Sequence, residues 1–366
     1  MPSGLDATHP TLSADELGWL ATLPDVESRL VFTGTSTGRT TYRVQDGPFT
    51  AAELASLPQR DWTLLMQDVE KHLPDFRSFF TATDFVPDWR IDDLMVSCAA
   101  PGGSVGPHRD NYDVFLCQGM GKRKWTTGSS ETAVADSDAN ELSLLEPFGA
   151  TSTYFAGEGD VLYLPPGVPH WGIAEDLCVT YSIGMRAPSK TELDCGADRI
   201  YGAGTSKSKT ISGDDVFYTD VDLKLVEAEP GRISGNTVQR MRAQGLLGST
   251  LSDVQLATVL GSVVTDTKAW LTPDTPAKKR VAKIIGQFDA QSDLLVHGMA
   301  RIAFCELENS SLFFANGFFR EINPQEFGIA RELCASRKVC AEGCGGSNVM
   351  AFIEWLVTKG VLDTEK

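Results

Sequence analysis

The stretch Pro101–Phe115, P-G-G-S-V-G-P-H-R-D-N-Y-D-V-F, joins a turn rich in glycine and proline to a His-x-Asp motif. His108 and Asp110 are two residues apart, and two such residues point to the same face of a β-strand. The pattern therefore predicts a strand that presents an imidazole and a carboxylate together. The glycines before the motif allow the backbone to approach a bound group closely.

A second histidine lies farther along the chain, in the stretch Pro165–His170 (P-P-G-V-P-H). This turn follows the apolar run V-L-Y-L, so we expect a strand, a tight turn and then His170. Each motif alone also occurs around ordinary surface histidines. Together they supply two histidines and one carboxylate on a β scaffold, the ligand set of non-haem Fe(II) sites with open positions for substrate and dioxygen. We therefore predict a metal site at His108, Asp110 and His170.

Short apolar runs cut by Gly and Pro fill residues 90–187 and predict an antiparallel β sandwich or barrel around these motifs. The residues before 90 have a mixed pattern. Ser13 is a helix start signal, and the runs S-R-L-V-F-T-G and T-T-Y-R-V-Q-D-G-P-F predict a hairpin. Apolar positions three and four apart predict a helix over residues 61–80, with His72 as a surface or cap histidine next to Pro74.

The pattern changes again after about residue 188. Helical spacing returns over residues 236–271 and on both sides of F-F-A-N-G-F-F-R-E-I-N, where Asn-Gly between aromatic strands is a strong hairpin signal. His297 lies in an apolar, helix-like run and is expected to be a core or boundary histidine. These zones predict three domains: a catalytic domain with N-terminal helices (1–188), a helical region (189–277) and a mixed C-terminal domain (278–366).

The composition limits the kind of partner and the compartment. Lys and Arg total 32 and Asp and Glu total 49, so the formal charge is −17. This acidity argues against direct nucleic-acid binding and suits a basic partner. The chain begins without the basic and apolar regions of a signal peptide, and no apolar run is long enough for a transmembrane helix. We expect no membrane contact and a cytoplasmic protein, although the nucleus or an organelle would also fit.

The sequence contains eight cysteines, too few for a disulfide scaffold, so we expect reduced thiols. Cys334, Cys340 and Cys344 cluster near the C-terminus. Their spacing is not the paired C-x-x-C of zinc ribbons and no histidine is nearby, so a metal site there is not favoured.

An Fe(II) oxygenase needs a reducing cosubstrate, usually 2-oxoglutarate, whose far carboxylate requires a cation inside the barrel. The predicted strand G-K-R-K-W offers Lys122, Arg123 and Lys124. Arginine is the better bidentate partner of a carboxylate. The periodicity of the strand does not decide which of the three side chains points inward.

Several blocks of the sequence resemble the bacterial ribosomal oxygenases, JmjC-type cupins that hydroxylate an arginine of a large-subunit ribosomal protein, the sixteenth in bacterial naming. The resemblance is dense from about Trp89 to Pro188 and looser outside, at D-V-E-S-R-L-V and at the A-N-G hairpin. Because long shared blocks carry both metal motifs, it is far more specific than a lone His-x-Asp. The dense blocks are W-R-I-D-D-L-M, the His-x-Asp stretch, Q-G-M-G-K-R-K-W, G-D-V-L-Y-L-P-P-G-V-P-H and Y-S-I-G-M-R-A-P.

The resemblance implies an α+β fold with three parts: a JmjC-type double-stranded β-helix of the cupin or jelly-roll kind, a helical dimerisation region, and a C-terminal winged-helix-like domain. These parts match the three zones above, and a homodimer is expected. The family usually has a further N-terminal segment before the D-V-E-S-R-L block. We therefore expect either an open sheet edge there or a replacement for that segment.

The resemblance also implies the roles of individual residues. The Fe(II) ligands fall on His108, Asp110 and His170, with dioxygen and 2-oxoglutarate as cosubstrates. The anchor of 2-oxoglutarate falls on Arg123. The pocket for the substrate arginine falls on Asp93, Met95 and Tyr112, and Asp93 is expected to pair with the guanidinium.

The leading hypothesis is therefore an Fe(II)- and 2-oxoglutarate-dependent hydroxylase that acts on an arginine in a basic segment of a ribosomal protein. A second hypothesis is the same chemistry on a histidine of another ribosomal protein. Asp93 favours the arginine, because a buried carboxylate requires a positive partner. A JmjC lysine demethylase and a cupin that binds metal without catalysis are the third and fourth hypotheses.

Overall fold

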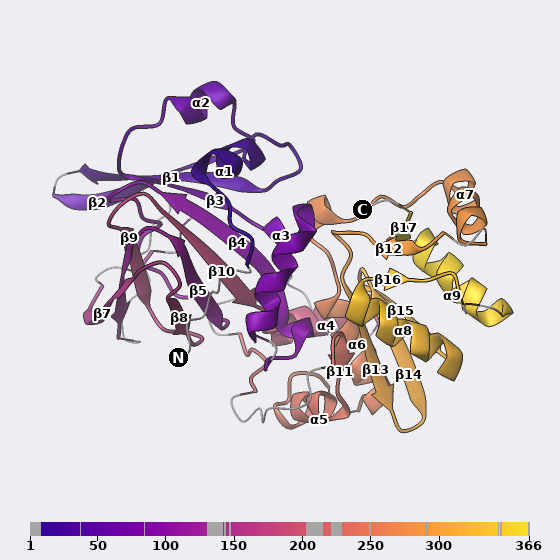
Figure 1. Ribbon diagram of the computed structural model, residues 1–366. Helices are drawn as coiled ribbons and strands as arrows, with labels where there is room; N and C mark the ends of the chain where they lie inside the picture. Colours follow the sequence, from indigo (N-terminus) through magenta and orange to yellow (C-terminus); the bar gives the residue numbers. More distant parts are fainter. Residues whose placement is uncertain are drawn as a thin grey trace. The chain divides into compact units, whose positions relative to one another are not determined.

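A computed structural model of the chain gives the fold drawn in Figure 1. The structure describes residues 9–36, 38–83, 85–129, 142, 144–145, 148–202, 215–220, 229–248, 250–289, 292–342, 344 and 346–364. Contacts divide the chain into two units, Met1–Thr83 with Ile91–Met185 and Asp84–Arg90 with Arg186–Lys366. None of the helices within the described ranges combines the length and the apolar character needed to cross a bilayer.

The first unit is built on two antiparallel sheets, which confirms the β fold predicted around the two motifs (Figure 1). The larger sheet has the strand order β2-β1-β3-β4-β10-β5-β8, and the smaller has the order β7-β6-β9. The strands are β1 (Ser28–Ser36), β2 (Arg39–Asp46), β3 (Trp62–Met66), β4 (Ile91–Ala99), β5 (Val114–Met120), β6 (Arg123–Gly128), β7 (Ala150–Ala156), β8 (Val161–Leu164), β9 (His170–Ala174) and β10 (Cys178–Met185).

The centre of the larger sheet is buried on both faces. Every residue of β10 is buried, because β4 and β5 pair with its two edges and both of its faces are covered. The sequence of β10 still alternates, since Val179, Tyr181 and Ile183 are each followed by a smaller residue, Thr180, Ser182 and Gly184. The predicted hairpin is confirmed as β1 and β2, which pair from Arg29 with Asp46 to Ser36 with Arg39.

Helices of the first unit are short. The start signal at Ser13 is confirmed, because its hydroxyl accepts from the Glu16 amide and the Glu16 carboxylate accepts from the Ser13 amide. These helices are α1 (Ala14–Leu20), α2 (Ala51–Ala55), α3 (Val69–His72) and the 3₁₀ helix η1 (Pro74–Thr83).

The helix predicted over residues 61–80 is wrong for its first half. Residues Trp62–Met66 form β3, which pairs with β1 on one side and β4 on the other. Only α3 and η1 are helical there. Apolar residues of a strand buried on both faces also fall three and four apart, so the spacing alone could not separate the two structures. His72 ends α3 and is half-buried, so it is not a surface residue.

In the second unit, helices cover both faces of one sheet. Leu312 and Phe314 pack with α4, α5 and α6, whereas Phe313 and Ala315 on the other face pack with α7, α8 and α9. The predicted boundary at 277/278 falls between these two groups of helices, and the domain boundaries stay predictions. The helices are η2 (Asp88–Arg90), α4 (Lys190–Tyr201), α5 (Gly235–Ala243), α6 (Asp253–Val264), η3 (Ala269–Leu271), α7 (Lys278–Asp289), α8 (Pro324–Ser336) and α9 (Ser347–Thr358).

The second unit has two small sheets, with strand orders β11-β13-β14-β15 and β16-β12-β17. The Asn-Gly hairpin is confirmed as β14 and β15. The helix-like run around His297 is instead a strand followed by a turn, because β12 ends just before this half-buried histidine. The strands are β11 (Arg232–Ile233), β12 (Leu294–Val296), β13 (Ile302–Leu307), β14 (Ser310–Ala315), β15 (Phe318–Ile322), β16 (Lys338–Val339) and β17 (Leu362–Asp363).

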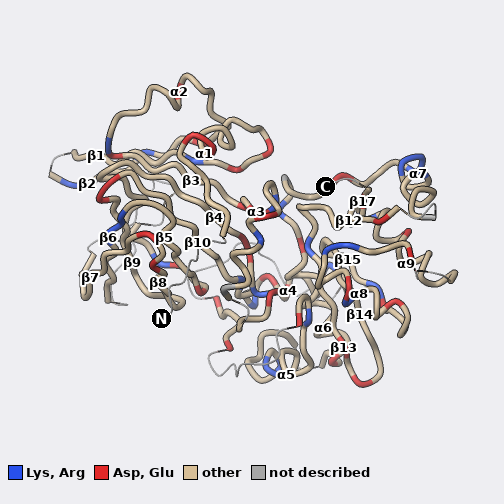
Figure 2. Tube along the Cα trace, viewed as in Figure 1, with Lys and Arg blue, Asp and Glu red and all other residues tan. Residues whose placement is uncertain are grey.

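Acidic and basic side chains are interspersed along the trace of each unit (Figure 2). Helix α7 is an exception, because its first turn carries Lys278, Lys279 and Arg280, all exposed. Arg280 pairs with Asp363 at 2.6 Å. Within the described residues, acidic side chains are therefore distributed over many elements rather than gathered in one.

Asn316 in the turn between β14 and β15 provides a test of this fold. It is 6% exposed with a φ of 49°, its side-chain oxygen accepts from the Arg301 amide at 3.0 Å, and its side-chain nitrogen donates to the Lys359 carbonyl. We expect Asn316→Ala to lower the free energy of unfolding by about 2–3 kcal/mol, through lost hydrogen bonds and backbone strain.

Asn309 is the matched control, because it is exposed in the two-residue turn between β13 and β14. Asn309→Ala should change the free energy of unfolding by less than about 0.5 kcal/mol. Urea unfolding of the three proteins measures both values. Equal losses in the two variants would contradict this account of the turn.

Candidate metal centre and adjoining pocket

The two predicted motifs are joined by a pair of backbone hydrogen bonds. The His108 amide donates to the His170 carbonyl at 3.0 Å, and the His170 amide donates to the His108 carbonyl at 2.8 Å. A further bond runs from the Gly167 amide to the Asp110 carbonyl at 2.7 Å. The turn before one histidine is thereby fixed to the loop that carries the carboxylate.

The expectation that His108 and Asp110 share one face of a regular strand is wrong. His108 forms only an isolated bridge with His170, and Asp110 lies in irregular backbone before β5. Pro107 and Pro169, each directly before one of the two histidines, have no amide hydrogen to donate and limit the ladder to that single bridge. The two side chains still converge, because the loop turns Asp110 back toward the bridge.

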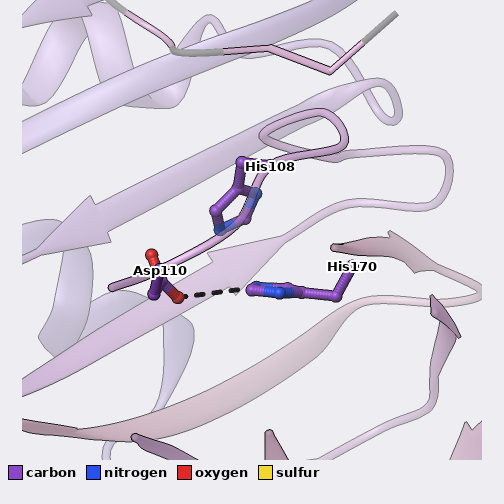
Figure 3. Close-up of side chains that lie close together, drawn as sticks. All are labelled: His108, Asp110 and His170. Carbon is purple, nitrogen blue, oxygen red and sulfur yellow. Dashed lines mark ion pairs between the residues drawn. The ribbon is translucent and has the colours of Figure 1, made fainter. Parts of the chain in front are cut away.

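One ligand atom of His108, of Asp110 and of His170 lies within 4.8 Å of the other two (Figure 3). The His170 Nε2 atom is 3.6 Å from a carboxylate oxygen of Asp110, and the two imidazole centroids are 4.2 Å apart. Within the described ranges, this is the single group of three or more His, Cys, Asp or Glu residues with ligand atoms so close. The three cysteines near the C-terminus form no such group there.

The same local contact orients each imidazole. The Nδ1 atom of His108 is 3.0 Å from the Gly106 carbonyl, and that of His170 is 3.0 Å from the Val168 carbonyl. When Nδ1–H donates to a carbonyl, Nε2 carries the lone pair and is available to a metal. Burial, and next the neighbouring His108, lower the pKa of His170 to about 4, although Asp110 opposes this shift. Two oriented imidazoles and a carboxylate suit a divalent metal such as Fe(II).

The strand β6 resolves which cation of Lys-Arg-Lys points inward. Arg123 is 5% exposed, whereas Lys122 is exposed and Lys124 is half-buried. The Arg123 Nη1 atom donates to the Ser97 hydroxyl at 3.1 Å, and the guanidinium lies 5.6 Å from the centroid of Trp125. Its buried Nε atom has no hydrogen-bond partner among the residues that the structure describes. A buried cation with an unpaired donor favours binding of an anion.

A line of side chains joins Arg123 to the metal ligands. Trp125 lies two residues along β6, and its ring is 6.0 Å from that of His170. Gly172 on β9 is opposite Trp125, and a Cβ atom added there would lie 2.6 Å from the indole. The absence of a side chain at Gly172 therefore makes room for the indole between the guanidinium and the metal ligands.

The structure brings together two of the three residues predicted to bind substrate. Asp93 is 8% exposed on β4, and a Cβ atom added at Gly184 would lie 3.0 Å from its Oδ1 atom and 3.9 Å from the Tyr112 ring. The Tyr112 hydroxyl lies close to the Asp110 carboxylate. Burial of that hydroxyl, and next the carboxylates of Asp110 and Asp93, raise the pKa of Tyr112. Asp93 and Tyr112 thus lie beside the metal ligands.

Met95 is on the same face of β4 as Asp93, but packs against a separate apolar cluster. This half-buried side chain contacts a group that contains Val31, Tyr42 and Leu144. The sequence did not point to Ser97, Trp125 or Gly184 as members of the pocket. Alternation could have indicated two of them. Ser97 lies two residues after Met95 on β4, and Trp125 lies two residues after Arg123 on β6.

A model of the JmjC domain family matches residues 78–193, the segment that holds every side chain of the site described above. The chain contains a JmjC domain. Over 232 residues, 63% of this chain, it is 36% identical to the ribosomal protein uL16 3-hydroxylase of Escherichia coli. Over 229 residues it is 33% identical to a probable ribosomal oxygenase of Haemophilus influenzae. The matches span 58% and 54% of those two proteins, so little more than half of their length.

Solved structures extend this similarity beyond the JmjC domain. An X-ray structure of E. coli ycfD has a TM-score of 0.71 and 27% identity, with 98% of this chain and 92% of that chain covered. A structure of the E. coli ribosomal oxygenase YcfD with cobalt and 2-oxoglutarate has a TM-score of 0.67, 27% identity and the same coverage. The JmjC domain and homology to the uL16 3-hydroxylase are thus both established for this chain.

Metal binding by the three candidate ligands is open to direct test. We expect the protein to bind one Co(II) ion per chain and to show its d–d absorption, and we expect His170→Ala to weaken binding more than about 100-fold. His297→Ala is the matched control, because His297 is half-buried in the second unit. Titration followed by absorbance measures both. Equal affinity in His170→Ala and in the unchanged protein would exclude this centre.

Proposed function

We propose that this protein is an Fe(II)- and 2-oxoglutarate-dependent hydroxylase of an arginine side chain in a large-subunit ribosomal protein. The observation that carries the proposal is that His108, Asp110 and His170 are linked through neighbouring side chains to two buried groups of opposite charge. Arg123 is buried beyond Trp125, and Asp93 lies at Gly184 beside Tyr112. Such a site has one end for an anion and another for a cation.

The ligand set and its surroundings support the choice of cofactors. Two imidazoles and one carboxylate leave coordination positions for a cosubstrate and dioxygen, as in non-haem Fe(II) oxygenases. A structure of the similar E. coli protein contains cobalt and 2-oxoglutarate. Cobalt commonly occupies such nitrogen and oxygen sites in place of iron.

In this proposal the side chains of the chain mainly orient the reactants. Arg123 pairs with the far carboxylate of 2-oxoglutarate, and Trp125 excludes water between that ion pair and the metal ligands. Asp93 holds the substrate guanidinium, while Tyr112 donates to Asp110 and restrains it. When bound, Fe(II) would couple two oxidations by dioxygen: one oxygen atom enters succinate as 2-oxoglutarate loses carbon dioxide, and the other is inserted into an unactivated C–H bond of the substrate. Positioning at this level accounts for much of the rate in such reactions.

The substrate class follows from charge and from the relatives. Asp93 is buried, so a cationic side chain gains more there than a neutral one. A chain with a net charge of −17 also attracts a basic protein segment better than it attracts RNA. The name of the E. coli relative specifies a ribosomal protein, uL16, as the substrate of that protein. A ribosomal protein substrate favours the cytoplasm as the working compartment of this chain.

The proposal includes a homodimer formed through residues 189–277 and a winged-helix-like fold for residues 278–366. The support for both is the family resemblance. The described part of residues 278–366 contains α7, α8 and α9 with short strands, as expected for a mixed domain. Light scattering of the purified protein tests the dimer.

The hydroxylase proposal predicts a mass increase of about 16 Da on arginine when the protein is incubated with Fe(II), 2-oxoglutarate and peptides of basic ribosomal proteins. Tandem mass spectrometry locates the oxygen atom, and succinate formation measures turnover. If the mass increase is found on histidine instead, the modified residue is a histidine and not an arginine. Formaldehyde release from methyl-lysine peptides would instead indicate a demethylase, and no succinate with any peptide would indicate a non-catalytic cupin.

Arg123 and Lys124 provide a matched pair of variants for the cosubstrate. Both are cations on β6, but only Arg123 points into the pocket. We expect Arg123→Met to raise the KM for 2-oxoglutarate about 100-fold, because two charge-assisted hydrogen bonds are lost. Lys124→Met should change it less than about twofold. Similar KM values in the two variants would argue against Arg123 as the anchor.

A further inference from the structure

The ladder between β3 and β4 ends before the part of β4 that lines the pocket. Its last pair is Met66 with Val96, so the preceding residues of β4 extend past the end of β3. On the other edge, β10 pairs along this part of β4, with Ile183 opposite Leu94. The edge of β4 toward β3 is therefore left with backbone groups that need another partner.

Glu70 supplies that partner at Leu94. Helix α3 follows β3 and packs against β4, and the Glu70 Oε2 atom accepts a hydrogen bond from the Leu94 amide at 2.9 Å. Glu70 is 2% exposed and the Leu94 side chain is fully buried. No water competes for this contact, so loss of the acceptor leaves a buried amide unsatisfied, at a cost larger than that of an exposed bond.

The surroundings of Glu70 compensate its charge only in part. Burial raises the pKa of Glu70, and the neighbouring Lys71 opposes this shift. Lys71 itself forms a buried ion pair with Asp68, which directly precedes α3. A carboxyl group held in such a place against its desolvation cost requires compensating contacts, and the Leu94 amide supplies a direct hydrogen bond beside the charges of Lys71 and Arg77.

The hydrogen bond between Glu70 and the Leu94 amide affects the site because Leu94 directly follows Asp93 in β4. Its amide belongs to the peptide group that directly follows Asp93. The amide points along the sheet toward Glu70 of α3, whereas alternation places the side chains of Leu94 and Asp93 on opposite faces of β4. The Asp93 carboxylate lies close to the backbone of β10, because a Cβ atom added at Gly184 would be only 3.0 Å from its Oδ1 atom. A tilt of this peptide group therefore moves the carboxylate relative to the metal ligands.

We propose that Glu70 is a positioning residue for the substrate cation, because it fixes the peptide group after Asp93 through the Leu94 amide. The inference rests on the proposed function, in which Asp93 binds the substrate arginine. Glu70 has no contact with substrate in this scheme. Its effect is on peptide affinity rather than on the reaction of 2-oxoglutarate, since a small displacement of a binding group is costly in such pockets.

Two substitutions at Glu70 separate the hydrogen bond from the charge. Glu70→Gln keeps an acceptor at the same reach and removes the charge. Glu70→Asp keeps the charge and withdraws the acceptor by one methylene. We expect Glu70→Gln to retain the KM for an arginine-containing ribosomal peptide, and Glu70→Asp to raise it about five- to tenfold, as for a lost buried hydrogen bond.

Two further variants serve as a reference and a control for these results. Asp93→Asn is the reference for a direct loss of substrate binding and should raise the same KM. Asp68→Asn is the matched control, because Asp68 belongs to the same buried charged group and forms an ion pair with Lys71. Asparagine also tolerates the left-handed backbone at this position, where φ is 55°. The KM of Asp68→Asn for the peptide should stay within about twofold of that of the unchanged protein.

Three readouts distinguish positioning from a general loss of structure. Glu70→Asp should keep the Co(II) affinity and the peptide-independent turnover of 2-oxoglutarate, and should speed hydrogen exchange of the Leu94 amide, measured by NMR. If Glu70→Asp keeps both the peptide KM of the unchanged protein and slow hydrogen exchange at the Leu94 amide, the inference about Glu70 is wrong while the proposed function still stands. An equal rise in KM in Asp68→Asn or in Glu70→Gln would overturn the inference in the same way. Failure of the unchanged protein to bind or oxidise any peptide would overturn the proposed function, and the inference with it.

Discussion

The pair of backbone hydrogen bonds between His108 and His170 is the contact on which the rest of the site depends. Each bond contributes about 0.5–1.5 kcal/mol, which is small beside the whole fold. Their importance is geometric, because they join two loops from different strands at the residues that carry the imidazoles. The Gly167 bond to Asp110 adds the carboxylate to the same unit. The ligand atoms thus converge through backbone contacts alone.

The polar groups of the pocket lie on the inward faces of β4 and β6 at alternate positions. Asp93 lies near the metal ligands and Arg123 lies beyond Trp125, so the two opposite charges are held apart on different strands. If they were adjacent, they would pair with each other and neither would be available to a ligand. In the proposed function, this separation lets one site bind an anionic cosubstrate and a cationic substrate together.

The sequence predicted the three candidate ligands and the antiparallel fold around them, because both depend on short local patterns. It did not predict how the ligands converge, since one bridge and a loop replace the expected strand. The helix predicted over residues 61–80 failed because a strand buried on both faces resembles a helix in spacing. Periodicity left the choice among Lys122, Arg123 and Lys124 open. The family resemblance pointed to Arg123, and the burial along β6 places that side chain inward. Glu70 carries no local signal at all, because its partner Leu94 is distant in sequence.

Gly172 has a consequence for the evolution of the JmjC domain in this lineage. The indole of Trp125 occupies the space beside β9 that a side chain at position 172 would need. Either residue can therefore change only if the other changes in the opposite sense of size. Across homologous chains we expect positions 125 and 172 to vary together, with a small residue opposite a large one, while the histidine at the start of β9 stays unchanged.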